Sequence, residues 1–303
     1  MHNISKKRRQ AEEKFLKSAS NRLGRKTFYR WCIKIALRSL NFFLTATFLK
    51  RFGVRGALNL KVEEVEFVFC NLPRNFNGLR ILLLTDFHAD AIAGLCDRVL
   101  QKAGQQDYDY CILGGDYTFS RRQERAKDYS TVSNIGNELC KRSRVFGVLG
   151  NHDLYSVGEA LESCGVEMLV NENACIEKGG EKLFICGVDD SHYYKADDFA
   201  LADKGVGEDE FKIIVGHSPC RYKEAARKGY SLYLTGHTHG GQICLPGGFA
   251  LATNMRAKRK MAKGKWEYDG MAGYTSRGVG VTNLGVRFFC KPELTVITLR
   301  RSS

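Results

Sequence analysis

Residues 81–88 read ILLLTDFH, a short apolar run that ends in two residues able to bind a divalent metal ion. Runs of this kind are typical of buried strands, while carboxylate and imidazole groups such as those of Asp86 and His88 are common metal ligands. Four later segments repeat the design, with a glycine between the apolar run and the polar residues. They read CILGGD at 111–116, VFGVLGNHD at 145–153, IIVGH at 213–217 and LYLTGHTH at 232–239.

Short apolar runs alternate with mixed stretches after residue 56, and this alternation predicts an α/β or mixed-sheet body. Predicted strands cover 65–69, 81–85, 110–113, 145–149, 183–188, 212–215, 232–235 and 294–299. Predicted helices fall between several of them, for example at 94–102 and 133–141. Because open α/β sheets collect their sites at the carboxyl ends of strands, we expect the five motifs to share one site.

The five motifs together point to a metal site, although each is weak alone. A single Asp-x-His segment is usually a surface turn, so the signal lies in five such segments in order, each at a strand end. Their residue types are coherent, because carboxylates, imidazoles and an amide carbonyl suit hard or borderline divalent ions. No cysteine joins them, which argues against a structural zinc site.

The order of these motifs resembles the calcineurin-like metallophosphoesterase superfamily. The matched motifs are D-x-H at 86–88, G-G-D at 114–116, G-N-H-D at 150–153, G-H at 216–217 and G-H-T-H at 236–239. The resemblance implies a layered α/β fold, in which two mixed sheets pack as a sandwich flanked by helices. It also implies a phosphoesterase with two divalent ions, Mn²⁺ being favoured, although such ligands also accept Mg²⁺, Fe or Zn²⁺.

The family's roles carry over to seven metal ligands and two further residues. Asp86, His88 and His239 would hold one ion, Asn151, His217 and His237 would hold the other, and Asp116 would bridge both. His152 would face the substrate as a catalytic residue, stabilising phosphate charge or protonating the leaving oxygen. Asp153 would orient that imidazole. The alternative for His152, a capping residue, stays open.

Four stretches narrow the resemblance to the bacterial membrane-associated phosphodiesterase subgroup: 236–243, 245–247, 276–280 and 287–294. This implies hydrolysis of a lipid-linked pyrophosphate or phosphodiester, in its sharpest form cleavage of UDP-2,3-diacylglucosamine to lipid X and UMP in lipid A biosynthesis. It also implies a peripheral location on the cytoplasmic face of the inner membrane. The segment Asp116-Tyr117-Thr118 departs from the arginine-bearing form seen in the better-known enzyme of this reaction, so homology to that form is distant.

The net charge of +14 is concentrated in residues 1–55, which contain 15 Lys and Arg against two Glu. Within them, residues 28–50 read FYRWCIKIALRSLNFFLTATFLK, with apolar residues at helical spacing. Lys34 and Arg38 would each cost about 2.5–3.5 kcal/mol at a bilayer centre, so we predict an amphipathic helix in the interface of an anionic membrane. A helix packed on the catalytic body is the alternative. We expect a catalytic domain at 56–303.

A second basic cluster follows the last metal motif, and we expect it to contact substrate phosphates or lipid headgroups. It includes Arg256, Lys258, Arg259 and Lys260. A solvated charge run is the alternative. The 11 cysteines are scattered without metal-binding spacing, and they predict reduced core thiols in a cytosolic compartment rather than a disulfide framework.

Two other functions stay open. A broad-specificity phosphodiesterase acting on soluble nucleotides, nucleic acid or other phospholipids could use the basic segment to bind phosphate backbones. The apolar aromatic face at 28–50 argues against a nucleic-acid partner, because a nucleic-acid arm needs no such face. A non-catalytic scaffold docked on a membrane would require missing ligands, whereas all seven are present.

Overall fold

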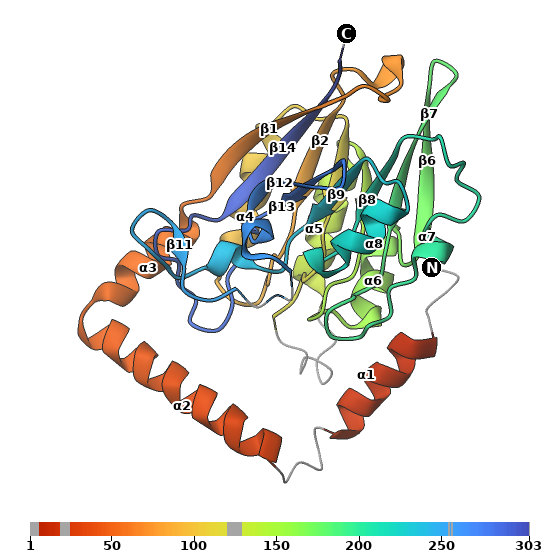
Figure 1. Ribbon diagram of the computed structural model, residues 1–303. Coiled ribbons are helices and arrows are strands. Elements are labelled where there is room, and N and C mark those ends of the chain that lie inside the picture. The colour runs from red at the N-terminus through yellow and green to blue at the C-terminus, as the bar shows by residue number, and fades with distance from the viewer. Residues whose placement is uncertain (1–5, 19–24, 120–128, 254, 256, 303) are drawn as a thin grey trace.

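The computed structural model describes residues 6–18, 25–119, 129–253, 255 and 257–302. Within them, two six-stranded sheets pack face to face, with helices outside (Figure 1). The first sheet has the order β1 (Lys61–Phe69), β14 (Glu293–Arg301), β2 (Arg80–Leu84), β3 (Tyr110–Leu113), β4 (Arg144–Gly147), β5 (Glu167–Met168). The second has the order β12 (Gly264–Tyr268), β13 (Met271–Thr275), β9 (Leu232–Thr235), β8 (Lys212–Val215), β7 (Glu181–Gly187), β6 (Glu172–Lys178). The predicted sandwich of mixed sheets is confirmed.

Both sheets are parallel in the middle and antiparallel toward an edge. In the first sheet β2, β3, β4 and β5 run parallel, and β14 runs antiparallel to β2. In the second, β13, β9, β8 and β7 run parallel, while β12 and β6 are antiparallel to their neighbours. Parallel strands covered on both faces have near-continuous apolar sequences, as in the RILLL of β2 and the KIIV of β8.

Three clusters of buried side chains separate the layers. The cluster between the sheets joins residues of both, among them Leu83, Ile112, Ile213 and Leu232. A second cluster lies between the first sheet and the helices α4 (Leu95–Gly104), α5 (Ser130–Cys140) and α6 (Tyr155–Glu162). A third lies between the second sheet and the short helices α7 (Phe199–Ala202) and α8 (Tyr222–Arg227). The molecule is therefore a sandwich of four layers.

Each of the eight predicted strands overlaps a strand of the structure, and the two predicted helices overlap α4 and α5. The sequence prediction missed β5, β6, β12, β13 and a small hairpin of β10 (Cys244–Leu245) and β11 (Phe249–Ala250). The edge strand β12 reads GKWEY and contains no apolar run, while the edge strand β6 reads ENACIEK, in which three apolar residues lie between polar and charged ones. Single 3-10 turns form η1 (Arg74–Phe76), η3 (Pro219–Arg221), η4 (His239–Gly241) and η5 (Arg259–Met261).

Among the described residues, three helices precede β1: α1 (Lys6–Ser18), α2 (Arg25–Ala46) and α3 (Leu49–Leu58). The prediction of one helix over 28–50 is wrong at its end, because Phe48 adopts a left-handed φ of 60° and separates α2 from α3. α3 packs on the catalytic body, where the N–H of Arg287 donates to the carbonyl of Gly53 at 2.9 Å. A Cβ at Gly53 would lie 2.6 Å from Val286 Cβ. The expected domain boundary after residue 55 thus falls inside a helix.

α2 runs clear of the two sheets in Figure 1 and packs mainly against α3. Among its described side chains Trp31, Phe42 and Phe43 are exposed, and Leu44 is buried. The described apolar side chains of α2 are therefore largely open to solvent rather than covered by the catalytic body. None of the helices in the described ranges combines the length and hydropathy needed to cross a bilayer.

Candidate metal centre

The seven predicted metal ligands lie in loops that follow strands of both sheets, and all seven are buried. In the first sheet, the loops after β2, β3 and β4 supply Asp86, His88, Asp116 and Asn151. In the second sheet, the loops after β8 and β9 supply His217, His237 and His239. The site therefore forms between the two halves of the sandwich, at the strand ends that the motifs predicted.

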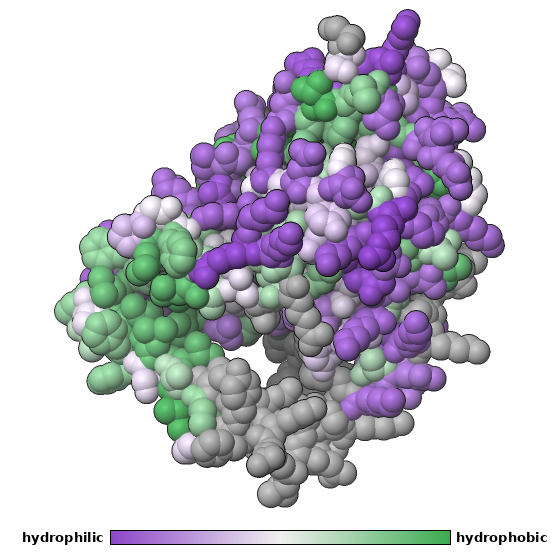
Figure 2. Space-filling model, in the orientation of Figure 1, coloured by the Kyte–Doolittle hydropathy of each residue, from purple (hydrophilic) through white to green (hydrophobic). Residues whose placement is uncertain are grey.

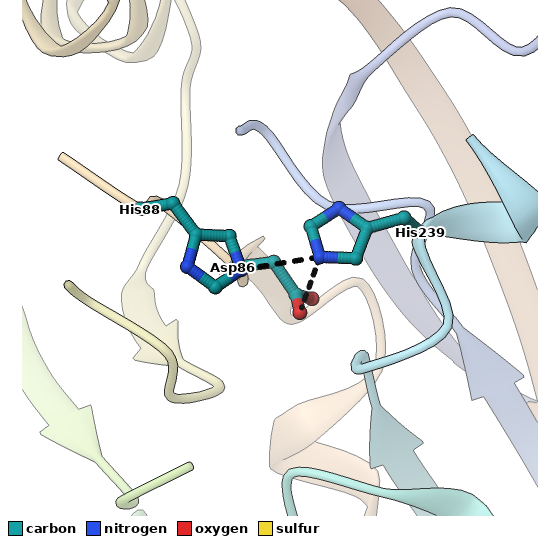
Figure 3. A group of neighbouring side chains, drawn as sticks. All are labelled: Asp86, His88 and His239. Carbon is teal, nitrogen blue, oxygen red and sulfur yellow. Dashed lines mark hydrogen bonds and ion pairs between the residues drawn. The ribbon is translucent and has the colours of Figure 1, made fainter. Parts of the chain in front are cut away.

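Asp86, His88 and His239 form a first triad (Figure 3). The Nε2 atom of His239 lies 3.4 Å from Asp86 Oδ1 and 3.2 Å from His88 Nε2. The two imidazole rings stack with their centroids 5.1 Å apart, so both turn Nε2 toward the carboxylate. One oxygen and two nitrogen ligands within 4.8 Å of one another can surround one divalent ion.

Asp116, His217 and His237 form a second triad. The Oδ2 atom of Asp116 lies 3.1 Å from His217 Nε2 and 3.8 Å from His88 Nε2, so this carboxylate stands between the triads, where a bridging ligand belongs. The buried Oδ1 of Asn151 has no hydrogen-bond partner within the described part of the chain. A buried acceptor without a partner is costly. The residues on either side of Asn151, Gly150 and His152, lie against Asp116, so a cation bound beside Asp116 would satisfy this acceptor.

The electrostatics of the triads suit a cation. Burial lowers the pKa of His88 to about 4 and, together with His88 and Arg287, holds the pKa of His239 well below its ordinary value. Both imidazoles are therefore neutral at pH 7, with a nitrogen lone pair free for a metal. Burial alone would lower the pKa of His217, but the carboxylates of Asp116 and Asp86 raise it to about 10. The size of this rise in pKa reflects a strongly negative potential from the two carboxylates, which a divalent cation would neutralise.

Most of the predicted ligands have strained backbones. Five of the seven have left-handed φ angles: Asp86 at 56°, His88 at 43°, Asp116 at 56°, His237 at 71° and His239 at 50°. This region costs an L-residue roughly 1–2 kcal/mol, and such strain gathers at functional sites. The strand-end motifs contain no sequence signal for it.

The prediction that Asp153 orients the His152 imidazole is wrong. The buried carboxylate of Asp153 instead accepts hydrogen bonds from the backbone N–H groups of Asp116 at 2.7 Å, Tyr117 at 2.8 Å and Gly150 at 2.8 Å. These donors belong to the loops after β3 and β4, so Asp153 joins two loops that carry metal ligands. A short carboxylate between two glycine-bearing turns is well suited to this role, because it can accept from several N–H groups at once.

His152 is held by other groups. Its Nδ1 lies 2.8 Å from the carbonyl oxygen of Phe119, and its ring stacks on the Phe119 ring with centroids 5.5 Å apart. Its backbone N–H donates to Asp116 Oδ1 at 2.7 Å. The His152 and His88 ring centroids are 5.1 Å apart, so this half-buried imidazole lies beside the first triad.

Several residues that support the ligands escaped the sequence analysis. The Oγ1 of Thr85 donates to Asp86 Oδ2 at 2.5 Å, and the backbone N–H of His237 donates to the same carboxylate at 3.0 Å. The buried guanidinium of Arg287 lies 3.2 Å from His239 Nδ1 and donates to the His239 carbonyl at 3.2 Å. Arg287 is the first residue of the stretch 287–294 that carries part of the family resemblance, but the residues around it in the sequence do not predict a role for it.

The described residues of the predicted basic cluster belong to neither triad. Arg256 falls outside the described residues, while Lys258, Arg259 and Lys260 are exposed. The guanidinium of Arg259 lies 4.4 Å above the Phe249 ring and donates to the carbonyl of Ala250, so it supports the β10–β11 hairpin. None of these contacts places the cluster at the triads.

Comparison with known proteins agrees with this geometry. The family model for calcineurin-like phosphoesterases matches residues 79–241. An uncharacterized metallophosphoesterase of Helicobacter pylori strain J99 is 27% identical over 290 residues, covering 92% of this chain and 72% of its own. Phosphodiesterase YaeI of Escherichia coli K12 is 26% identical over 234 residues, covering 74% and 83%. A Bos taurus transmembrane protein with a metallophosphoesterase domain is 31% identical over 232 residues, covering 69% and 51%.

The matched region spans more than half of the chain and ends two residues after His239. It contains every residue of the two buried triads. Fold, donor set and family match therefore agree, and the chain belongs to the calcineurin-like phosphoesterase family as a hydrolase with a dinuclear metal centre.

Proposed function

We propose that this hydrolase cleaves a pyrophosphate or phosphodiester bond of a lipid-linked substrate at a membrane surface. The observation that carries the proposal is an exposed apolar surface on α2, α3 and the β10–β11 hairpin, which packs against the loop after β9. Large exposed apolar patches mark interaction sites. In its sharpest form the substrate is UDP-2,3-diacylglucosamine and the products are lipid X and UMP. The proposal includes a peripheral position on the cytoplasmic face of the inner membrane, and the eleven free cysteines support a reducing compartment.

The first part of the proposed docking surface is helical. Phe42 is 75% exposed, and Trp31, Phe43, Phe48 and Phe52 are exposed with it along α2 and α3. Aromatic side chains favour the boundary between lipid and water. Exposed arginines accompany them, namely Arg38, Arg51 and Arg55. Each contributes about 1 kcal/mol of attraction near an anionic leaflet, which favours an anionic bilayer as the partner.

The second part of the docking surface belongs to the catalytic domain. Leu245, Phe249 and Leu251 of the hairpin segment are exposed, as is Phe289. Figure 2 shows hydrophobic residues gathered over α3, the adjoining end of α2 and the region of β11. The hairpin packs against the loop that carries His237 and His239. Gly241 of this loop lies so close to Ala250 of β11 that a Cβ on Gly241 would overlap the Ala250 side chain. A lipid held on this surface would therefore lie near a loop that carries a metal ligand.

The chain's own residues divide the chemistry between them. When bound, two divalent ions supply Lewis-acid stabilisation of the phosphate and an activated water. The two triads and the Asn151 carbonyl would hold these ions, with the Asp116 carboxylate standing between the triads. His152 lies beside the first triad, where its imidazole can stabilise phosphate charge or protonate a leaving oxygen. The names of the E. coli and bovine relatives, a phosphodiesterase and a transmembrane protein, support a diester substrate and a membrane setting.

The substrate is tested with purified full-length protein in detergent containing Mn²⁺. UMP and lipid X should appear from UDP-2,3-diacylglucosamine, and the Asn151→Ala variant should release neither. Bis(4-nitrophenyl) phosphate serves as a soluble substrate in parallel. Cleavage of this diester without UMP release would overturn the lipid A substrate and favour the broad-specificity phosphodiesterase.

The docking surface is tested by sedimentation with vesicles that contain anionic lipid. Leu251 and Val68 are each 58% exposed, but Val68 lies near the end of β1 that is remote from α3. Leu251→Glu should weaken vesicle binding, whereas Val68→Glu should not, and both should hydrolyse bis(4-nitrophenyl) phosphate at the native rate. Equal binding by the two variants would overturn the docking surface. The native chain could instead fail to bind vesicles and form a dimer in solution. Loss of that dimer in Leu251→Glu would assign the surface to a second copy of the chain.

A further inference from the structure

The side chain of Arg8 is completely buried although it comes from the polar helix α1. Its neighbours Lys7 and Arg9 are exposed. Arginine is almost never fully buried unless it is paired. Arg8 is neither a predicted metal ligand nor a predicted catalytic residue. The fold therefore places a fixed positive charge from the N-terminus inside the catalytic domain, in a position that calls for an explanation.

The partners of Arg8 are far away in the sequence. Its guanidinium forms a buried ion pair with Asp189, 181 residues further on. It also donates to the carbonyl of Asp153 at 2.6 Å and, at the longer distance of 3.4 Å, to that of Gly150. The guanidinium carbon lies 4.3 Å from the centroid of the Tyr194 ring. The Arg8 guanidinium thus contacts a carboxylate, two carbonyls and an aromatic face at once. A planar group with several N–H donors can do this, whereas the single ammonium group of lysine cannot.

Glu12 adds a second contact one helical turn further along α1. Its carboxylate accepts from Arg8 Nε at 2.9 Å and from the backbone N–H of Tyr155 at 3.0 Å. Tyr155 is the first residue of α6, where N–H groups lack helical partners. α1 therefore bonds to both ends of the segment 150–155.

This segment carries Asn151 and His152. Its inner side is held by the Asp153 carboxylate, which bonds to the backbone of Gly150 and of the β3 loop. Its outer side is held by Arg8 through the main-chain carbonyls of Gly150 and Asp153, the residues that flank Asn151 and His152. The backbone that carries Asn151 and His152 is thus held from two sides. Only the contacts of the Asp153 carboxylate lie within the family motifs.

We propose that Arg8 is a positioning residue of this hydrolase, holding segment 150–155 so that Asn151 faces the second metal site. The inference rests on the dinuclear centre and not on the identity of the substrate. Removing groups that orient metal ligands typically weakens metal binding 10- to 100-fold. Because Arg8 acts through the backbone beside Asn151, its loss affects the site of Asp116, Asn151, His217 and His237 and spares that of Asp86, His88 and His239.

The test is calorimetric titration of metal-free, full-length protein with Mn²⁺, which resolves two sites without any need for turnover. Arg8→Met should weaken one site about tenfold and leave the other within twofold. Lys7→Met, from the exposed neighbour, should leave both sites at native affinity. Arg8→Lys keeps the charge but not the forked guanidinium, so its affinity for Mn²⁺ at the weakened site should lie between those of the other two variants.

Arg8→Met leaves Asp189 buried without its cation, so a second variant guards against unfolding. Arg8→Met/Asp189→Asn removes both charges, and its fold is checked by circular dichroism. Weakening of one site in this folded double variant supports the proposal. Native affinity at both sites, or equal weakening at both, would overturn it and leave Arg8 with a purely structural role. Failure of the native protein to release UMP while it binds two Mn²⁺ would count against the proposed substrate and leave this proposal unaffected.

Discussion

Replacing Asp153 by alanine should destabilise the protein even when no metal is bound. In the structure its buried carboxylate accepts three backbone hydrogen bonds shorter than 3 Å, from Asp116, Tyr117 and Gly150. Alanine leaves three N–H groups without that acceptor, at about 1–3 kcal/mol for each buried donor. Burial, followed by the nearby Asp116 carboxylate, raises the pKa of Asp153 to about 6, so ionising it in the fold has a cost that alanine removes.

The lower value of about 1 kcal/mol for each of the three donors is therefore the appropriate one. The expected loss in the free energy of unfolding is about 3 kcal/mol. This is a large share of the roughly 5–15 kcal/mol available to a typical domain. Urea unfolding followed by circular dichroism measures it, with EDTA present so that metal binding cannot contribute. Asp153→Asn keeps one acceptor oxygen, and its loss should be smaller.

Asp107→Ala is the matched control, because Asp107 is exposed. Its unfolding free energy should stay within about 0.5 kcal/mol of the native value. A loss below about 1 kcal/mol for Asp153→Ala, less than a single unpaired donor costs, would refute the assignment of Asp153 as the residue that joins the two loops.

Three further outcomes are expected. Asp116→Ala should abolish hydrolysis of bis(4-nitrophenyl) phosphate and bind fewer than two Mn²⁺ per chain by elemental analysis; full activity would contradict a bridging role. His152→Ala should lower kcat at least about 100-fold while Mn²⁺ affinity stays native, and an unchanged kcat would leave His152 as a capping residue. Gly236→Ala would place a Cβ 2.5 Å from Thr85 Oγ1 and 2.8 Å from Thr85 Cβ, so overpacking of about 1–3 kcal/mol should lower the Tm by at least about 2 °C; a native melting curve would show that the loops yield without cost.

The metal ligands could be predicted because each follows an apolar run. A strand that is buried on both faces leaves a continuous apolar signature, and the chain can change direction only where that signature ends. The loops after β2 and β9 are clear examples, since RILLL and LYLT are followed within a few residues by Asp86 and by His237 and His239. Local sequence therefore contained both the position of the site and its ligand types.

The supporting contacts could not be predicted because they join distant segments through the backbone. Arg8 and Asp189 are 181 residues apart, and neither lies in a periodic pattern that would reveal the other. Asp153 follows His152 directly, and the motif suggested a bond between them, yet its carboxylate turns toward N–H groups of the β3 loop. The break at Phe48 depends on a single left-handed residue inside an otherwise helical pattern.

Because the ligands are divided between the two sheets, the packing between the sheets determines the geometry of the metal centre. Asp86 and Asp116 move with one sheet, whereas His217 and His239 move with the other. The apolar layer between the sheets sets how far apart these two groups stand. Close-packed interiors transmit a change in volume rather than absorb it. A smaller side chain deep in this layer, remote from any ligand, would therefore alter the span between the ligand groups and with it the ionic radius that the centre prefers.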